Sequence, residues 1–89
     1  MKMAKQTFKI GESCIGGIIE VNITGKVIVI KALDWQTNKE VRRGTTDTTD
    51  PQCERKIDDF LTDLTSYYFV EKVMKFIKDN VNFNNVSYF

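Results

Sequence analysis

The hydrophobic and polar positions follow two different periods along the 89 residues, and the change occurs at Asp50-Pro51. Before this step apolar side chains tend to alternate with polar ones, which is typical of β-strands with one buried face. After it, apolar residues recur at spacings of three and four, as on one side of an α-helix. The pattern therefore predicts an α+β domain, in which an antiparallel meander of three or four strands precedes two helices packed on one face.

The first two strands are predicted around a glycine pair. Residues 7–11 and 15–23 alternate apolar and polar side chains, and Ile19, Val21 and Ile23 share one face of the second run. Gly16-Gly17 indicates either a β-bulge or a close approach of another part of the chain to the backbone. No Lys-Ser or Lys-Thr follows the pair, so a phosphate-binding loop is the weaker interpretation.

Two further strands are predicted up to about residue 46. Thr24-Gly25 separates two β-forming runs, with glycine second, which predicts a type I′ turn. Residues 26–33 carry four apolar side chains in succession, so both faces of this strand are apolar. That is expected of a central strand covered by helices on one side and partly by a loop, the tail or a partner on the other. Residues 34–38 are interpreted as a turn and residues 39–46 as a polar edge strand.

The connection to the helices is predicted over residues 45–50, where two Thr-Thr-Asp triplets follow each other. Short polar side chains of this kind hydrogen-bond to their own backbone and stabilise turns. The repeat lacks the glycine and terminal glutamate of a calcium-binding loop, so a linker is the favoured interpretation. Asp50 is expected to cap the first helix and Pro51 to take its first position, where the missing N–H costs no hydrogen bond.

Two helices are expected within about 51–79, with a break near Thr65-Ser66. The apolar stripe of the first helix is centred near Ile57 and Leu64, and Phe60 and Leu64 are predicted core residues that face the sheet. Apolar residues between 69 and 77 would lie on almost the opposite side of one continuous helix, which a small domain cannot bury as well. The tail, residues 80–89, is expected either to add a short strand or to remain mobile.

Length and charge limit the class of protein. With 89 residues the chain fits a single domain with one small core. The 13 Lys and Arg residues against 12 Asp and Glu give a formal net charge of +1, which does not favour a strong nucleic-acid binder. No apolar run is long enough for a signal peptide or a membrane span, so a cytoplasmic location is expected. Cys14 and Cys53 are then expected to be free, largely buried thiols.

The chemistry-bearing residues do not favour an enzyme. The chain has no histidine, which removes the commonest general base and metal ligand. Asp58, Asp59 and Asp63 lie close together on the first helix, where a solvated face is the favoured interpretation and carboxylate chemistry the alternative. No other set of residues has the spacing of a catalytic or metal site, and no cofactor is expected.

The opening Phe8-Lys9-Ile10-Gly11, the Gly16-Gly17 pair and the strand over residues 26–33 are followed by a helical end in two stages. In size and layout this series resembles small phage-encoded inhibitors, especially anti-CRISPR proteins, over most of the chain. The resemblance implies stoichiometric inhibition of a nuclease or another host defence protein by covering its surface. It assigns no functional residue, and the near-neutral charge differs from the strongly acidic members that mimic DNA.

The leading hypothesis is a non-enzymatic module that binds another protein. Trp and Arg are enriched among binding hot spots, and the hairpin over residues 35–43 carries both beside an edge strand. Aromatic residues at the start of the second helix serve either as core edge or as binding anchors. The partner-binding candidates are Trp35, Lys39, Arg42, Arg43, Tyr67 and Tyr68. The alternatives are a tryptophan that only covers the end of the core, a small nucleic-acid-binding module with a basic and aromatic patch, and a homodimer.

Overall fold

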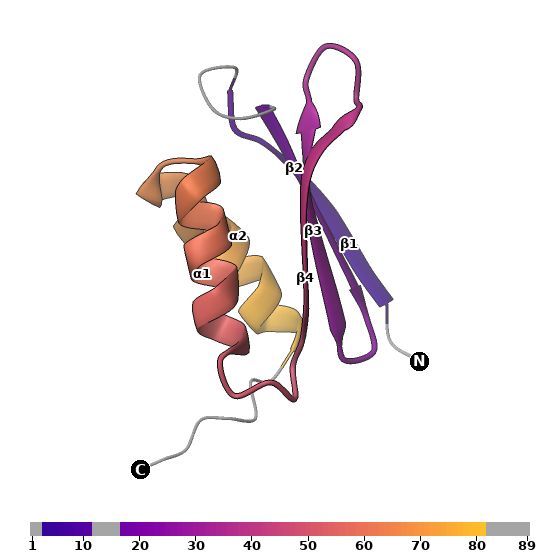
Figure 1. The fold of residues 1–89 in the computed structure, drawn as a ribbon, viewed down its shortest axis with the longest axis vertical. Helices are drawn as coiled ribbons and strands as arrows, with labels where there is room; N and C mark the ends of the chain where they lie inside the picture. The colour runs from indigo at the N-terminus through magenta and orange to yellow at the C-terminus, as the bar shows by residue number, and fades with distance from the viewer. Residues whose placement is uncertain (1–2, 12–16, 82–89) are drawn as a thin grey trace.

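The computed structural model of the chain describes residues 3–11 and 17–81. Within them, four strands are followed by two helices (Figure 1). The strands are β1 (Met3–Lys9), β2 (Gly17–Thr24), β3 (Val27–Asp34) and β4 (Glu40–Asp47). The helices are α1 (Cys53–Leu64) and α2 (Tyr67–Asn80). Neighbouring strands pair antiparallel in the order β1-β2-β3-β4, which confirms the predicted α+β meander.

Both helices lie on the same side of the sheet and bury one of its two faces (Figure 1). Alternate residues of the two central strands point to this side. They are Ile19, Val21 and Ile23 of β2 and Ile28, Ile30 and Ala32 of β3, all of them buried. The helices contribute Ile57, Leu61 and Leu64 from α1 and Val70, Val73 and Ile77 from α2. The alternation of the central strands therefore directs one face into the core and leaves the other outside it.

Two strands extend further than the sequence pattern predicts. β1 begins at Met3 instead of residue 7, because Met3 pairs with Thr24 at the end of β2. β4 continues to Asp47, because the long β3 pairs with residues 45–47. The predicted edge strand is therefore confirmed over residues 40–46, whereas the linker predicted from residue 45 is wrong for residues 45–47, and the connection to α1 is limited to residues 48–52. Polar threonines join a strand readily when the neighbouring strand offers a free edge.

The turn between β2 and β3 lies one residue later than predicted. Thr24 pairs with Val27, so Gly25 and Lys26 form the two-residue loop. Gly25 has a φ of 60°, whereas Lys26 does not have a positive φ. Glycine at the first central position fits a type II′ turn, so the predicted type I′ turn is wrong. Both turn types close a two-residue hairpin, and the two strands pair as expected.

α1 begins at Cys53 and not at Pro51 as predicted. Asp50 closes a turn before the helix, since its Oδ1 accepts a hydrogen bond from the Gln52 N–H at 2.8 Å and its carbonyl accepts one from the Cys53 N–H at 3.0 Å. Lys56 Nζ lies 2.6 Å from Asp50 Oδ2 in an ion pair. Gln52 takes the N-cap position, without a side-chain cap bond. Asp50 thus fixes the connection rather than capping the helix itself.

The predicted break between the two helices is confirmed. α1 ends at Leu64, Thr65 is extended, and α2 starts at Tyr67 after Ser66. The extended residues turn the chain back, so that the apolar stripes of both helices face the same side of the sheet (Figure 1). One core therefore takes up both stripes within a single copy of the chain.

Phe60 corrects one prediction about the core. Leu64 is buried as expected, but Phe60 is only partly buried and packs at the margin of the core. Its ring lies over Gly44 of β4, where an added Cβ would come within 3.0 Å of Phe60 Cδ1. Ile57 and Leu61 lie at the middle of the buried side of α1 instead, and both are almost completely buried.

Some predictions concern residues outside the described parts of the chain. They are the burial of Cys14, the role of Gly16 and the conformation of residues 82–89. Gly17, the second member of the glycine pair, is described and lies at the start of β2.

Candidate interaction surface on the open face of the sheet

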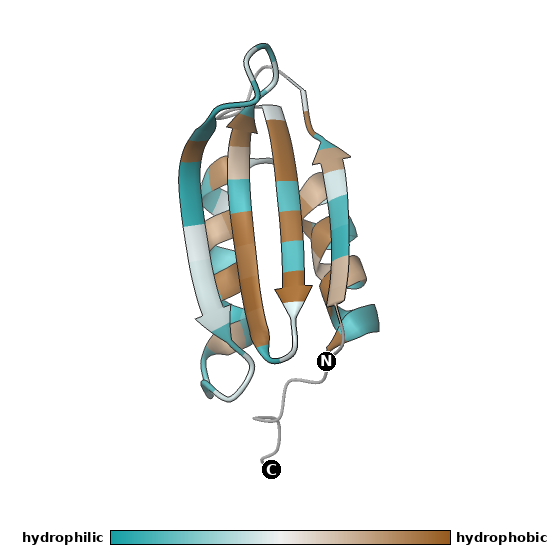
Figure 2. Ribbon diagram, turned by 90° about the vertical axis from the view of Figure 1, so that its right-hand side faces the viewer, coloured by the Kyte–Doolittle hydropathy of each residue, from teal (hydrophilic) through white to brown (hydrophobic). Residues whose placement is uncertain are grey.

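The side of the sheet that faces away from α1 and α2 is called the open face (Figure 2). No helix or strand of the described residues lies on it. Antiparallel pairing arranges its side chains in rows across the strands. One row contains Lys9, Ile18, Leu33 and Glu40, and the next contains Thr7, Glu20, Lys31 and Arg43. The first of these rows lies closest to the loop between β3 and β4.

Several apolar side chains are found on or beside the open face. Ile18 and Leu33 are direct neighbours in register, and both are half-buried although no described element covers them. Of the exposed large hydrophobic residues in the described chain, four belong to the sheet and its β3–β4 loop: Met3, Val27, Trp35 and Val41. Apolar surface of this kind marks sites of association when it is contiguous. Ile18 and Leu33 belong to the row nearest the β3–β4 loop, and Trp35 of that loop lies beside Ile18.

Trp35 directly follows β3 and packs over Gly17 of β2. A Cβ on Gly17 would come within 3.0 Å of Trp35 Cβ and Cδ1. Gly17 also has a φ of 96°, which a residue with a side chain rarely adopts. Gly17 therefore confirms the close approach that was one of the two interpretations of the glycine pair. The contact holds the indole in place, while Trp35 remains 50% exposed.

The loop that presents Trp35 is fixed by its own hydrogen bonds. Asp34 Oδ1 accepts one from the Gln36 N–H and Oδ2 accepts one from the Thr37 hydroxyl, both at 3.1 Å. The Asn38 N–H donates to the Asp34 carbonyl at 2.7 Å, and Asn38 has a φ of 61°, which asparagine tolerates. Lys39 closes the loop, because its carbonyl accepts from the Asp34 N–H at 2.9 Å, and its side chain is exposed.

A shallow cavity of about 260 Å³ lies beside Trp35. It is lined by Lys9, Gly11, Gly17, Ile18 and Trp35. Small-molecule sites usually enclose roughly 300–1,000 Å³. This cavity therefore suits a single side chain of a partner better than a cofactor.

A charged network occupies the middle of the open face. Glu20 lies between Lys5 and Lys31, with an N···O distance of 3.8 Å to each. It also accepts a hydrogen bond from Asn22 Nδ2 at 2.8 Å. Lys9, in contrast, has no carboxylate within ion-pair distance among the described residues. One basic group next to the cavity is therefore left without an ionic partner within this part of the chain.

The two predicted arginines of the hairpin do not form one patch. Arg43 pairs with Lys31 in register and so lies on the open face, where its Nη2 is 2.8 Å from Glu40 Oε1. Hydrogen bonding from Arg43 lowers the pKa of Glu40. Arg42 pairs with the buried Ala32, which places it on the opposite, helix-facing side. Only Arg43 therefore shares a face with the apolar residues around Trp35.

Tyr67 and Tyr68 belong to the helical layer, apart from Trp35. They begin α2 and are 73% and 61% exposed. A hydrogen bond between the Tyr67 hydroxyl and Glu71 raises the pKa of this tyrosine. Lys72 Nζ lies 4.8 Å from the centre of the Tyr68 ring. The structure thus separates Tyr67 and Tyr68 on the helices from Trp35 and Arg43 on the open face, while Arg42 lies on the helix-facing side of β4.

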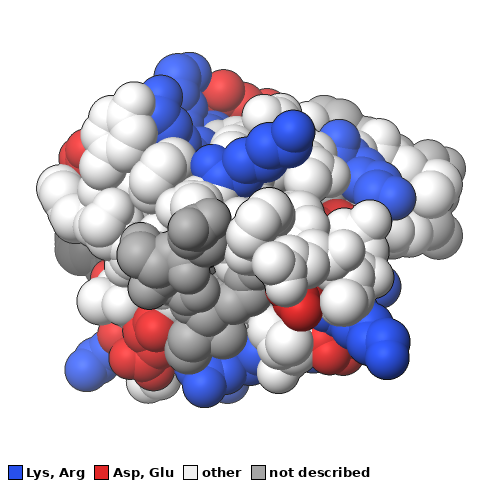
Figure 3. All heavy atoms as spheres, turned by 90° about the horizontal axis from the view of Figure 1, so that it is seen from above, with Lys and Arg blue, Asp and Glu red and all other residues white. Residues whose placement is uncertain are grey.

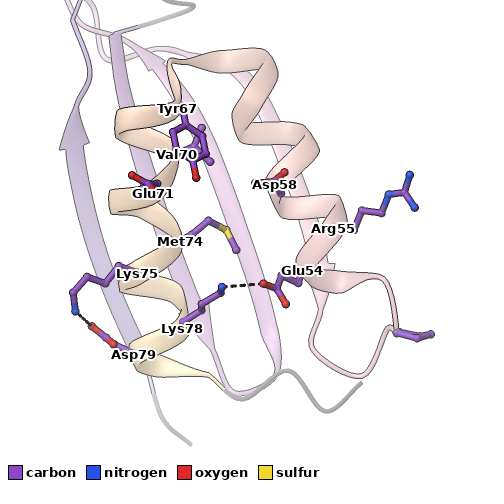
Figure 4. Close-up of a pocket in the computed structure, with 11 residues that line it drawn as sticks. Glu54, Arg55, Asp58, Tyr67, Val70, Glu71, Met74, Lys75, Lys78 and Asp79 are labelled. Carbon is purple, nitrogen blue, oxygen red and sulfur yellow. Dashed lines mark hydrogen bonds and ion pairs between the residues drawn. The ribbon is translucent and has the colours of Figure 1, made fainter. Parts of the chain in front are cut away.

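A groove of about 820 Å³ runs between α1 and α2 (Figure 4). Lys78 Nζ of α2 and Glu54 Oε2 of α1 form an ion pair of 3.0 Å across it. The buried Val70 and Met74 and the exposed Tyr67 line the groove together with these charged residues, so its walls combine apolar and charged surface. The open face is the stronger candidate because it carries a tryptophan that is held against Gly17 beside the apolar Ile18.

Cys53 and the aspartates of α1 show no arrangement for chemistry. Cys53 is fully buried at the start of α1, and burial raises the pKa of its thiol, which disfavours the reactive thiolate. Asp58, Asp59 and Asp63 are exposed on the helix. Residues 3–11 and 17–81 contain no group of three or more His, Cys, Asp or Glu side chains placed to hold a metal ion.

Charges of both signs are mixed at the end of the molecule that carries the β3–β4 loop (Figure 3). Blue Lys and Arg groups alternate there with red Asp and Glu groups, so neither sign forms a continuous surface in this view. A strong, salt-dependent attraction for nucleic acid needs several basic groups that act together. This end of the molecule offers local pairs and single charges instead.

No protein-family model matches the chain, and no curated protein and no solved structure matches it either. Neither helix of the described chain is long and apolar enough to cross a membrane. Function is therefore inferred from the residues of this chain alone.

Proposed function

We propose that the chain is a non-enzymatic binding module that holds another protein on its open face, with Trp35 as the central anchor. The proposal rests above all on the apolar group formed by Ile18, Leu33 and Trp35, which lies outside the core and which no described element covers. Tryptophan is among the residues most enriched at binding hot spots. An apolar centre surrounded by charged side chains is also the usual arrangement of a protein interface.

Binding on this surface needs little rearrangement of the protein. The contact with Gly17 and the hydrogen bonds of Asp34 hold Trp35 before a partner arrives. A preorganised anchor loses less conformational entropy on binding, which strengthens the complex. The module acts by occupying the surface of its partner and makes or breaks no covalent bond. Stoichiometric occupation of a host defence protein, which the resemblance to phage-encoded inhibitors implies, is the form of this activity that we propose.

Single-stranded nucleic acid is the second candidate ligand, because Trp35 lies beside Lys9 on an uncovered sheet. An exposed aromatic ring stacks with bases, and neighbouring lysines bind phosphates. Glu20 and Glu40 lie on the same face and reduce its positive field. Affinity that falls steeply with salt, with a loss of several decades between low and physiological salt, would favour this candidate over a protein.

The proposal is tested by replacing Trp35 with alanine. The protein that co-purifies with the wild-type chain is isolated, and its affinity for each variant is measured by calorimetry. Trp35→Ala is expected to weaken binding by about 2 kcal/mol, or roughly 30-fold, as for a hot-spot aromatic residue. Circular dichroism confirms that the variant is folded.

Tyr68→Ala is the matched control for this experiment. Tyr68 is also an exposed aromatic residue, but it lies on the helical layer. A second pair compares Arg43→Glu on the open face with Arg42→Glu on the opposite side of the same strand. Only the Trp35 and Arg43 variants should lose affinity. Full affinity of Trp35→Ala, or an equal loss in Tyr68→Ala, would contradict the proposal.

A further inference from the structure

We infer that the segment held on the open face is acidic, presents one apolar side chain to the cavity beside Trp35, and offers carboxylates to the lysines around it. The inference rests on the proposed function and adds the chemistry of the partner. Two features support it: the shape of the cavity and the balance of charges on the face.

The cavity has the size and lining for one apolar side chain. Ile18 and Trp35 supply its apolar surface, while Gly11 and Gly17 supply only backbone. The space around Gly11 is open, because no other heavy atom lies within 4 Å of the position that a Cβ would take there. An aliphatic side chain of a partner can therefore contact the exposed part of the indole without displacing a side chain of residues 3–11 or 17–81.

Lys9 provides the charge next to this cavity. It pairs with Ile18 in register, so the amine belongs to the same row as the apolar lining. No carboxylate of the described residues lies within ion-pair distance of it. A carboxylate beside the inserted side chain would find an exposed cation here, whose attraction is modest because water and salt screen it.

The rest of the open face also favours an acidic partner. Its register positions hold four basic residues, Lys5, Lys9, Lys31 and Arg43, and three acidic ones, Glu20, Glu40 and Asp47. All three carboxylates are already bonded within the chain. Glu20 contacts two lysines, Glu40 binds Arg43, and Asp47 Oδ1 accepts hydrogen bonds from Thr49. Because Lys5 and Lys31 share one carboxylate, the face keeps a positive surplus, and a second copy of the chain would bring the same surplus against it.

The inference is tested with three capped pentapeptides and nitrogen-edited NMR spectra of the full chain. The acidic probe carries one leucine between two pairs of glutamates, the basic probe replaces the glutamates with lysines, and the third probe replaces the leucine of the acidic probe with serine. Trp35 is the only tryptophan, so its indole N–H gives one signal for the cavity. The acidic leucine probe is expected to shift this signal in a saturable way, at least about fivefold more tightly than either other probe.

Reversing the charge beside the cavity gives the decisive comparison. Lys9→Glu should lower the affinity for the acidic probe about fivefold and raise that for the basic probe. Lys72→Glu, a matched reversal on α2, should change neither affinity. If Lys9→Glu leaves the ratio of the two affinities unchanged, the inference is wrong.

The outcomes also separate this inference from the proposed function. Equal binding of the acidic and basic leucine probes at Trp35 would overturn the acidic partner but leave protein binding on the open face intact. No shift by any probe, together with full affinity of Trp35→Ala for the natural partner, would overturn both. A shift of open-face signals with protein concentration alone would assign the face to a second copy, and a larger shift by a single-stranded oligonucleotide would assign it to nucleic acid.

Discussion

Both the backbone conformation of Gly17 and its packing against Trp35 favour glycine at this position. Its φ of 96° disfavours any side chain, and an added Cβ would come within 3.0 Å of Trp35 Cβ and Cδ1. Gly11, at the opposite end of the connection to β2, has a similar φ of 91° but no neighbouring atoms around its Cβ position. Substitutions at these two glycines therefore distinguish the effect of backbone strain from the effect of the contact with Trp35.

Alanine at the two glycines should have unequal effects. Gly11→Ala adds only backbone strain and is expected to cost about 1 kcal/mol of unfolding free energy. Gly17→Ala adds the collision with Trp35 and should cost about 2–3 kcal/mol, with a red shift of the tryptophan emission. Urea unfolding followed by this fluorescence measures both. Equal losses at the two positions would mean that Trp35 does not pack on Gly17.

Asp47 and Asp50 stabilise the connection between β4 and α1. Asp47 Oδ1 accepts hydrogen bonds from the N–H and hydroxyl of Thr49 at 2.8 and 2.7 Å, and these bonds lower the pKa of Asp47. The pKa of Asp50 is lowered by Lys56 and by the N–H of Gln52. In both cases the charged carboxylate is favoured in the folded protein.

Stability should therefore fall in acid. Carboxylates with a lowered pKa in the folded state contribute stability that is complete above their unfolded pKa of about 4 and is lost as the pH falls through the folded pKa. Asp47→Asn and Asp50→Asn should each flatten the decline of the urea midpoint below about pH 4. A series of urea titrations between about pH 2 and pH 7 measures the slope. Variants with the same decline as the wild type would show that these turns do not stabilise the charged form.

α1 and β4 are in contact where the Phe60 side chain lies over Gly44, which has no side chain. The Phe60 ring covers Gly44, and both lie at the margin of the core and not at its centre. A glycine in a strand usually weakens it, so its presence here is explained by the space that the ring needs. The edge strand and the helix are thereby packed directly against each other.

Truncating Phe60 should cost less than a fully buried aromatic residue. We expect Phe60→Ala to lower the unfolding free energy by about 2 kcal/mol, below the ~3–5 kcal/mol typical of a buried phenylalanine. Gly44→Ala should cost about 1 kcal/mol in the wild type, and nothing once Phe60 is alanine, because the clash is gone. Urea unfolding of the two single variants and the double variant measures this coupling. Additive losses would mean that ring and glycine do not touch.

The type and order of the elements could be predicted from the sequence, but not all of their ends. Runs of about eight residues distinguish a period of two from a period of 3.6. The threonines of residues 45–46 fit a linker and an edge strand equally well, and only their pairing with the long β3 decides. The turn type likewise depends on which residue pairs with Thr24, a choice that Gly25 alone does not fix.

The candidate surface could be predicted only in part. Trp35 and Arg43 follow from residue type, whereas Lys9 and Ile18 come from distant strands and reach Trp35 only through the register. Four successive apolar residues in β3 did indicate that this strand has a second apolar face. Successive residues of a strand point to opposite faces, so the sequence already implied that Arg42 and Arg43 do not belong to one binding surface.

At the scale of the whole molecule, the described residues form two layers, a sheet and a pair of helices. The helices and the sheet bury each other, and this leaves the outer side of the helices and the open face in contact with solvent (Figures 1 and 2). The groove between the helices mixes charged and apolar side chains around an ion pair, whereas the open face combines apolar residues with a tryptophan that packs on Gly17. The edge of β4 is interrupted by a bulge at Val41, which discourages pairing with another sheet. The open face is therefore distinguished by its held tryptophan, a residue type that is enriched at binding hot spots.

Hydroxyl-radical footprinting of the wild-type chain, free and in complex with its purified partner, shows directly whether the partner binds the open face. Mass spectrometry compares the oxidation rates of Trp35 on the sheet with those of Tyr67 and Tyr68 on the helices, which serve as internal controls. If the partner binds the open face, Trp35 loses most of its reactivity in the complex and both tyrosines keep theirs. Protection of the tyrosines with unchanged oxidation of Trp35 would contradict binding on the open face and place the partner on the helical layer.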